Sequence, residues 1–209
     1  FIFFLVLGLG LFGRNIVNYG LPFVRHYKIS DFSAAVQNWA IAQAPNGFMY
    51  FGNNEGLLEY DGRSWRVYSV PNHSAVRTIY IDSNGRIYVG ANNEFGYFEP
   101  NEYGTLVYTS ISYKLENVNI QTVWKIIPAD NGIYFISGRK SIFKYFEGKV
   151  KQIATPPTFS EFRGFLVNNI FYLFDNFAGL AVVKNDTVYR FHDEVFNKGI
   201  AVYSILPLD

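Results

Sequence analysis

Residues 77–88 read RTIYIDSNGRIY, and this stretch is the second of four copies of one pattern along the chain. The other copies are WAIAQAPNGFMY (39–50), WKIIPADNGIY (124–134) and FRGFLVNNIFY (162–172). Each copy has a strand-like run, a turn rich in Asn and Gly, and a second strand that ends at a tyrosine. The four tyrosines, Tyr50, Tyr88, Tyr134 and Tyr172, are 38, 46 and 38 residues apart. A repeat of about 40 residues built from short strands is typical of a β-propeller blade.

Each repeat predicts four strands, ordered from the inside of the propeller to the outside. In the first blade we expect strands at 40–44, 48–51, 57–60 and 65–70, separated by turn sequences such as Pro45-Asn46-Gly47 and Asp61-Gly62. No segment has the caps and the 3.6-residue periodicity of a helix, so the predicted class is all-β. The predicted blades cover approximately 36–71, 75–112, 120–156 and 161–193.

The two ends of the repeat array carry further strand-like runs. Residues 23–27 have strand character, and in closed propellers such a strand completes the last blade. Residues 201–206 resemble the inner strand of a fifth blade that begins within 200–209. Four blades and the start of a fifth cannot close a ring of the usual size, so we expect residues 23–209 to be a partial propeller and the chain a fragment of a longer protein.

The first thirteen residues are all apolar or Gly, and Arg14 follows them. This run is short for a membrane span and matches the hydrophobic part of an export signal. We therefore expect residues 1–22 to hold a truncated signal peptide or membrane anchor and a linker, with a buried strand as the other alternative. The signal peptide and the anchor both imply export.

Composition excludes several classes of function. The net charge is +1, only 17% of the residues are charged, and the basic residues are scattered, so no nucleic-acid binding is expected of this segment. The chain has no cysteine, which excludes disulfides, thiolate metal sites and a cysteine nucleophile. Aromatic residues make up 19% of the sequence and suit the pleated, half-buried surfaces of blade cores.

The first two copies resemble a known repeat. Residues 47–62, GFMYFGNNEGLLEYDG, are followed by Trp65 and Tyr68 and resemble the two-component regulator propeller repeat. Residues 82–90, DSNGRIYVG, are a second match, although this copy has EFGYF (94–98) where the repeat has Gly-Leu. The third and fourth copies diverge, with Ser137 and Asp175 near the position of the repeat's glycine. The resemblance extends over residues 23–209.

The resemblance implies a function. The family forms the exported, ligand-sensing part of bacterial hybrid two-component or triple-tyrosine/helix-turn-helix regulators. It therefore implies a periplasmic or extracytoplasmic sensor within a membrane-anchored receptor, which touches the membrane only through the N-terminal leader or a downstream helix. It also implies signal transduction through a separate kinase or DNA-binding output, and a homodimer in the full-length receptor.

Strand order predicts where a ligand would bind. The loops between second and third strands, and those between one blade and the next, emerge on the same face and converge on the channel mouth. Amides and charged groups in these loops could bind a small polar ligand such as an oligosaccharide, although Asn also builds tight turns without any ligand. The candidate ligand-binding residues are Asn53, Asn54, Glu55, His73, Asn92, Asn93, Glu94, Arg139, Lys140, Asp175 and Asn176.

Two other functions remain open from the sequence. One is a propeller used as a scaffold for protein interaction or dimerisation. The other is an exported lyase or hydrolase, because a propeller lyase of antibiotics shares a similar repeat. Catalysis would have to use His73 with Glu55 or Glu94, while His26 and His192 fall in predicted outer strands without metal-ligand spacing. No hydrolase, phosphate-loop or paired-carboxylate motif occurs, so we expect no enzyme activity, no cofactor and no metal in this segment.

Overall fold

The computed structural model describes residues 20, 24–138, 140–160, 162–191 and 201–207, which form four antiparallel four-stranded sheets. The first sheet contains β1 (Asn38–Gln43), β2 (Met49–Asn53), β3 (Gly56–Tyr60) and β4 (Trp65–Tyr68). The second contains β5 (Val76–Ile81), β6 (Ile87–Ala91), β7 (Glu94–Pro100) and β8 (Leu106–Ser110). The third contains β9 (Val123–Ala129), β10 (Gly132–Ser137), β11 (Ser141–Phe146) and β12 (Lys149–Ile153). The fourth contains β13 (Phe162–Val167), β14 (Ile170–Asp175), β15 (Gly179–Lys184) and β16 (Thr187–Arg190).

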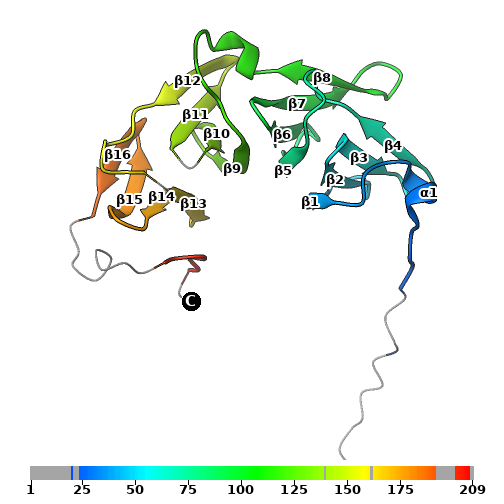
Figure 1. Cartoon of the computed structure of the whole chain (residues 1–209), viewed down its shortest axis with the longest axis horizontal. Coiled ribbons are helices and arrows are strands. Elements are labelled where there is room, and N and C mark those ends of the chain that lie inside the picture. The colour runs from blue at the N-terminus through cyan, green and yellow to red at the C-terminus, as the bar shows by residue number, and fades with distance from the viewer. Residues whose placement is uncertain (1–19, 21–23, 139, 161, 192–200, 208–209) are drawn as a thin grey trace, which may run out of the picture.

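The sheets stand side by side in an arc, as in a propeller (Figure 1). Within each sheet the strands follow sequence order, so the first strand of each blade lies on the concave side and the fourth lies outside. The prediction of an all-β fold is confirmed, and the four antiparallel four-stranded sheets are consistent with a propeller. The strands expected in the first blade agree with the observed bounds to within two residues.

Short helical segments also occur. A single helical turn, α1 (Ile29–Phe32), precedes the first blade, and a 3-10 turn, η1 (Ser112–Lys114), follows the second. Within the described residues no helix is long and apolar enough to cross a membrane. The predicted leader, residues 1–13, lies outside the residues that the structure describes.

Neither of the two strands predicted at the ends of the array forms in this structure. Residues 24–28 form no strand, and Tyr27 instead packs edge-on against Trp65, with ring centroids 5.1 Å apart. Residues 201–207 also form no strand, although Tyr203 lies against β13. Its ring centroid is 4.8 Å from the guanidinium carbon of Arg163. A strand needs hydrogen-bonded neighbours, and neither segment has a partner strand among the described residues.

The turns follow from residue chemistry, as the turn at Asp82 illustrates. The carboxylate of Asp82 accepts hydrogen bonds from the backbone N–H groups of Asn84 and Arg86, both at 2.9 Å. Gly85 closes the turn with φ of 80° and donates its N–H to the Asp82 carbonyl at 3.0 Å. The turn from β5 to β6 thus depends on an aspartate carboxylate that accepts backbone hydrogen bonds, as a carbonyl would, and on a glycine that tolerates positive φ.

The hydrophobic core lies between the blades. One buried cluster joins Leu57 and Val70 of the first blade to residues of the second, such as Ile87 and Phe98. Two further clusters join the second blade to the third and the third to the fourth. Burying one such side chain contributes about 1.5–3 kcal/mol. Each blade therefore depends on its neighbours for most of its stability, as expected of a repeat array.

The glycine of the repeat provides room for the next blade. A β-carbon added at Gly52 would lie 2.7 Å from the backbone oxygen of Val76, the first residue of β5. One added at Gly90 would lie 2.5 Å from Cγ1 of Val123, the first residue of β9. The glycine therefore allows the inner strand of the following blade to approach closely.

In the third blade Ile136 occupies this position, because it pairs with Lys125 as Gly90 pairs with Thr78. Here the next inner strand carries the glycine instead. A β-carbon on Gly164 would lie within 2.2 Å of Cδ1 of Ile136. The divergence of the third copy is thus compensated across the interface between blades.

Candidate functional site

Two sets of loops meet on one face of the arc, as strand order predicts. The loop between the first and second blades donates two hydrogen bonds to the backbone oxygen of Asn92, from Asn72 Nδ2 at 2.8 Å and Ser74 Oγ at 3.1 Å. The loop before the third blade reaches the same turn, where Thr122 Oγ1 donates to Asn92 Oδ1 at 3.0 Å. We call this surface, formed by residues 53–56, 69–75, 91–94, 111–122, 137–138, 140–141 and 175–179, the loop face.

Two of the predicted ligand-binding residues, Asn53 and Asp175, are buried turn residues at the end of the second strand of their blades. Asn53 Nδ2 donates to the Ala35 oxygen and to Asn38 Oδ1, both at 2.7 Å. Asp175 accepts hydrogen bonds from the backbone N–H groups of Ser160, Phe177 and Ala178, each at 2.8 Å. These side chains stabilise the loops from beneath, and the structure does not bring them to the surface.

Glu94 is also buried beneath the loop face. Its Oε1 accepts hydrogen bonds from the hydroxyl groups of Tyr108, Ser110 and Ser112 at 3.0, 2.8 and 2.6 Å. Burial, together with this carboxylate, raises the pKa of Tyr108 well above its usual range. The three hydroxyl groups hold Glu94 in the structure of the second blade, so it does not project toward a ligand.

Exposed candidates remain on the loop face. Asn92 and Asn93 form the turn between β6 and β7, and Asn93 has φ of 54°. His73 is exposed in a tight turn, where its N–H donates to the Val70 oxygen at 2.9 Å. Glu55 and Lys140 are exposed, while Arg139 lies outside the described residues. Among the described residues, no group of three or more His, Cys, Asp or Glu side chains could hold a metal ion.

The remaining two candidates contact side chains of the inner strands. Asn54 Oδ1 accepts a hydrogen bond from Trp39 Nε1 at 2.7 Å, and Asn176 Oδ1 accepts one from Arg163 at 3.3 Å. Trp39 and Arg163 are the second residues of β1 and β13. These contacts lead from the loop face to the concave wall of the arc.

Three residues at that wall were not predicted as site residues: Trp39, Arg77 and Trp124. Each is the second residue of an inner strand, and each falls where the register with the second strand shifts. Such a β-bulge leaves one residue unpaired and re-aims its side chain, and bulges occur often beside functional sites. A bulge has no reliable signal in a single sequence, although Trp39 and Trp124 begin two of the four repeat copies.

The bulges bring the three side chains together from three different blades. The guanidinium of Arg77 lies 3.7 Å from the ring centroid of Trp39 and 5.5 Å from that of Trp124. The two indole rings meet at an angle of 70° with centroids 6.2 Å apart. Trp39 is 39% exposed and Trp124 is 49% exposed, so both present ring surface to solvent. We call these residues the Trp–Arg–Trp cluster.

A cavity of about 310 Å³ continues from this cluster toward the fourth blade. Trp124, Lys125 and Arg163 line it, together with Phe165 and Tyr203. The Lys125 ammonium lies 5.4 Å from the ring centroid of Phe165, and burial lowers the pKa of Lys125 below its ordinary value. Aromatic surface and cations thus alternate along the inner wall.

The fold and this wall define a propeller of four described blades with an aromatic and cationic inner surface. The family model for the two component regulator propeller matches residues 69–93, which run from the end of the first blade to the loop face of the second. The resemblance of the repeats to that family is therefore confirmed. The search of curated proteins gave no significant match.

Solved structures share this fold. A streptogramin B lyase aligns with a TM-score of 0.57 at 17% identity, over 75% of this chain and 55% of the lyase. The extracellular domain assigned to a hybrid two-component system of B. thetaiotaomicron aligns with a TM-score of 0.55 at 18% identity, over 76% of this chain and 21% of that domain. A second such domain from the same organism aligns at 14% identity with a TM-score of 0.50, over 83% of this chain and 30% of that domain. The chain thus spans about half of the lyase and about a fifth to a third of the two sensor domains.

Proposed function

We propose that the chain is a non-catalytic, ligand-sensing propeller from the extracytoplasmic part of a membrane-anchored bacterial regulator. The family repeat at residues 69–93 and the neighbours among extracellular domains of two-component systems support a sensory role. A binding role is supported most directly by the Trp–Arg–Trp cluster, where side chains from three blades meet at an exposed surface.

The ligand class follows from the side chains at the surface. Exposed indole rings offer flat apolar faces, and the neighbouring amides of Asn54 and Asn92 offer directional donors and acceptors. Hydroxyl-bearing rings, as in an oligosaccharide, present both an apolar face and a polar edge. We therefore propose a glycan fragment or a similar small polar molecule, bound where the loop face meets the inner wall.

The lyase neighbour provides weaker support for catalysis. At 17% identity it shares the fold alone. Of the groups that catalysis would need, Glu94 is buried and bonded to three hydroxyl groups, which leaves His73 and Glu55 exposed on separate loops. If His73→Ala abolished turnover of any candidate substrate, the non-catalytic proposal would be overturned.

The proposal is tested with the full-length protein that contains these residues. A glycan library is screened for ligands that raise the melting temperature, because a ligand that binds only the folded state stabilises it by mass action. Trp39→Ala and Trp124→Ala should each weaken binding of a hit by about tenfold, since each removes a stacking surface. Tyr103→Ala is the matched control, because Tyr103 is 83% exposed in the turn between β7 and β8, away from the cluster.

Two results would refute the sensing proposal. One is the absence of any stabilising ligand across the library. The other is an equal response of Trp39→Ala, Trp124→Ala and Tyr103→Ala to a hit. Either result would favour the alternative in which the propeller is a scaffold for protein interaction or dimerisation.

A further inference from the structure

Arg77 has hydrogen-bonding capacity that the described protein does not use. Its Nε and Nη1 atoms are buried and have no hydrogen-bond partner among the described residues. The guanidinium instead lies against the faces of Trp39 and Trp124. Buried donors are almost always paired in native proteins, and an unpaired donor on a charged group is destabilising by more than about 1–3 kcal/mol. Nη2 is not one of these buried atoms, so a partner outside the described chain can bond to the guanidinium there.

The charge of the inner wall identifies the kind of partner. The four inner strands β1, β5, β9 and β13 contain Arg77, Lys125 and Arg163 and no Asp or Glu, whereas the whole chain has a net charge of only +1. Within the described residues, none of these three cations forms an ion pair with a carboxylate. The concave wall is therefore a local excess of positive charge.

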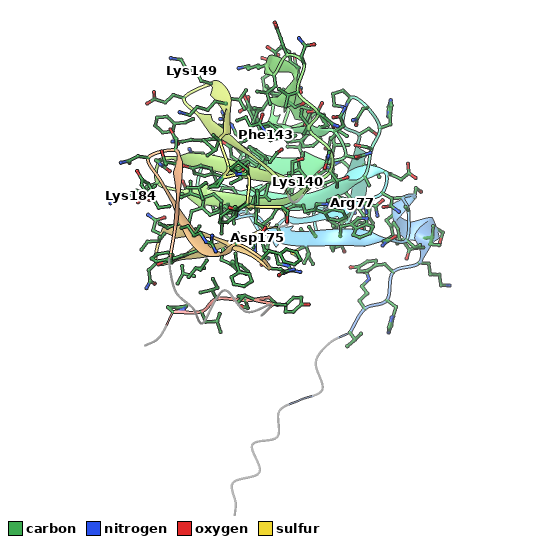
Figure 2. The ribbon with its side chains drawn as sticks, turned by 60° about the vertical axis from the view of Figure 1, so that its left-hand side comes forward. Arg77, Lys140, Phe143, Lys149, Asp175 and Lys184 are labelled. Atoms are coloured by element: carbon green, nitrogen blue, oxygen red, sulfur yellow. The ribbon has the colours of Figure 1, made fainter. Side chains whose placement is uncertain are left out.

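Several cations outside the inner strands are paired with carboxylates. Arg66 pairs with Glu59 at 2.8 Å, and Arg86 pairs with Glu99 at 2.9 Å. Lys144 on β11 pairs with Asp186 at 2.7 Å. Figure 2 shows Lys149 and Lys184 at the outer margin of the molecule, away from Arg77. Within the described residues, Arg77, Lys125 and Arg163 thus lie beside aromatic rings without a carboxylate partner.

We propose that the Trp–Arg–Trp cluster binds an acidic saccharide, with Arg77 bonded to an oxyanion on a sugar ring that stacks on Trp39 or Trp124. The planar guanidinium presents donors in a geometry that matches carboxylate and sulfate oxygens. Lys125 and Arg163 extend the positive surface toward the cavity of the fourth blade, where further acidic units of an oligomer would lie. This inference rests on the proposed sensing function and adds the charge of the ligand.

The experiment uses the full-length protein and titration calorimetry with four trisaccharide probes. These are tri-galacturonic acid, its methyl ester, a neutral galactose trisaccharide and a sulfated form of that trisaccharide. The acid and its ester have the same sugar backbone, but the ester carries uncharged methyl carboxylates in place of the anionic groups. The sulfated and neutral pair distinguishes a sulfate from a carboxylate as the recognised group. We expect at least one acidic probe to bind about ten- to hundredfold more tightly than its neutral partner, with affinity that falls as salt rises.

Variants test the role of Arg77. Arg77→Gln should remove most of the preference for the acidic probe over its neutral partner, and Arg77→Lys should restore part of it. The matched control is Arg63→Gln, because Arg63 is exposed in the turn between β3 and β4 and lies on the opposite face from the loops. If Arg77→Gln does not fold, Lys125→Gln provides the second test, with an expected loss of several-fold for the acidic probes alone.

The outcomes separate this inference from the proposed function. Equal affinity for charged and neutral probes, or unchanged affinity in Arg77→Gln, would overturn the acidic ligand and leave a saccharide sensor in place. Tight binding of neutral library members with no binding of the acidic probes would also overturn the acidic ligand and leave a saccharide sensor in place. If no saccharide of any charge bound the full-length protein, both proposals would fail together.

Discussion

The contact between Ile136 and Gly164 gives a sharp test of how the blades are packed. A β-carbon introduced by Gly164→Ala would lie within 2.2 Å of Cδ1 of Ile136, 3.1 Å from Cε2 of Phe171 and 3.4 Å from Cγ1 of Ile127. The first contact is more than 1 Å too short for two carbon atoms, which prefer about 3.5–4.0 Å. Because Ile136 is buried in the core between the third and fourth blades, moving its side chain aside would disturb its contacts there. We expect Gly164→Ala to lower the free energy of unfolding by about 1–3 kcal/mol.

Removing the obstructing methyl group should compensate. Ile136→Val deletes Cδ1 and alone should lower the free energy of unfolding by about 0.5–1.5 kcal/mol. In the double variant the new methyl group occupies the vacated space, so the loss should be smaller than the sum of the two single losses by about 1–2 kcal/mol.

The assay is urea denaturation of the four proteins, followed by tryptophan fluorescence and circular dichroism. Gly20→Ala is the control, because nothing lies within 4 Å of a β-carbon at that position, and it should change stability by less than about 0.5 kcal/mol. Strict additivity of the two substitutions, or a neutral Gly164→Ala, would refute the interpretation that Gly164 compensates for Ile136.

Further predictions concern the other packing and charge contacts. Gly52→Ala should be destabilising by about 2–3 kcal/mol and should not be rescued by Val76→Ala, because the obstacle is a backbone oxygen; rescue in a denaturation series would contradict this. Glu94→Ala should lower the free energy of unfolding by about 2–4 kcal/mol, since three hydroxyl groups lose their acceptor, whereas Glu94→Gln should lose less; equal losses would contradict the hydrogen-bonding explanation. Burial acts to raise the pKa of Asp186, but hydrogen bonds from Lys144 and a second lysine outweigh it and hold that pKa below its ordinary value. The ionised Asp186 therefore contributes its full share to the free energy of unfolding above about pH 4, and this contribution is lost as the pH falls through the lower pKa of the folded state. In Asp186→Asn the free energy of unfolding should accordingly fall by about 1 kcal/mol less than in the unchanged protein when the pH is lowered through this range.

The sequence predicted the blades well because their determinants are local and repeated. Asp82 and Gly85 specify their turn by short-range hydrogen bonding and positive φ, and the spacing of Tyr50 and Tyr88 follows from the length of one blade. Strand order then placed two sets of loops on the same face, which the contacts to Asn92 confirm.

The site was harder to predict because its determinants are not local. Asn53 and Glu94 are polar residues in loops or at strand ends, and the sequence cannot reveal whether such a side chain points outward or bonds to the layer beneath it. Trp39 and Trp124 were expected in blade cores, as most aromatic residues of the chain are. A register shift of one residue at each inner strand turns them toward the concave wall instead.

The Trp–Arg–Trp cluster also provides a spectroscopic signal that depends on the angles between neighbouring blades. Its three side chains belong to three separate blades, so the 3.7 Å and 6.2 Å separations among them depend on how each blade tilts against the next. A molecule bound across the cluster would contact the first, second and third blades together and hold their relative orientation fixed. Indole fluorescence depends on the distance and angle to a neighbouring guanidinium, and Trp39 and Trp124 are two of only three tryptophans in the chain. The fluorescence of the native protein should therefore report changes in the angles between its first three blades.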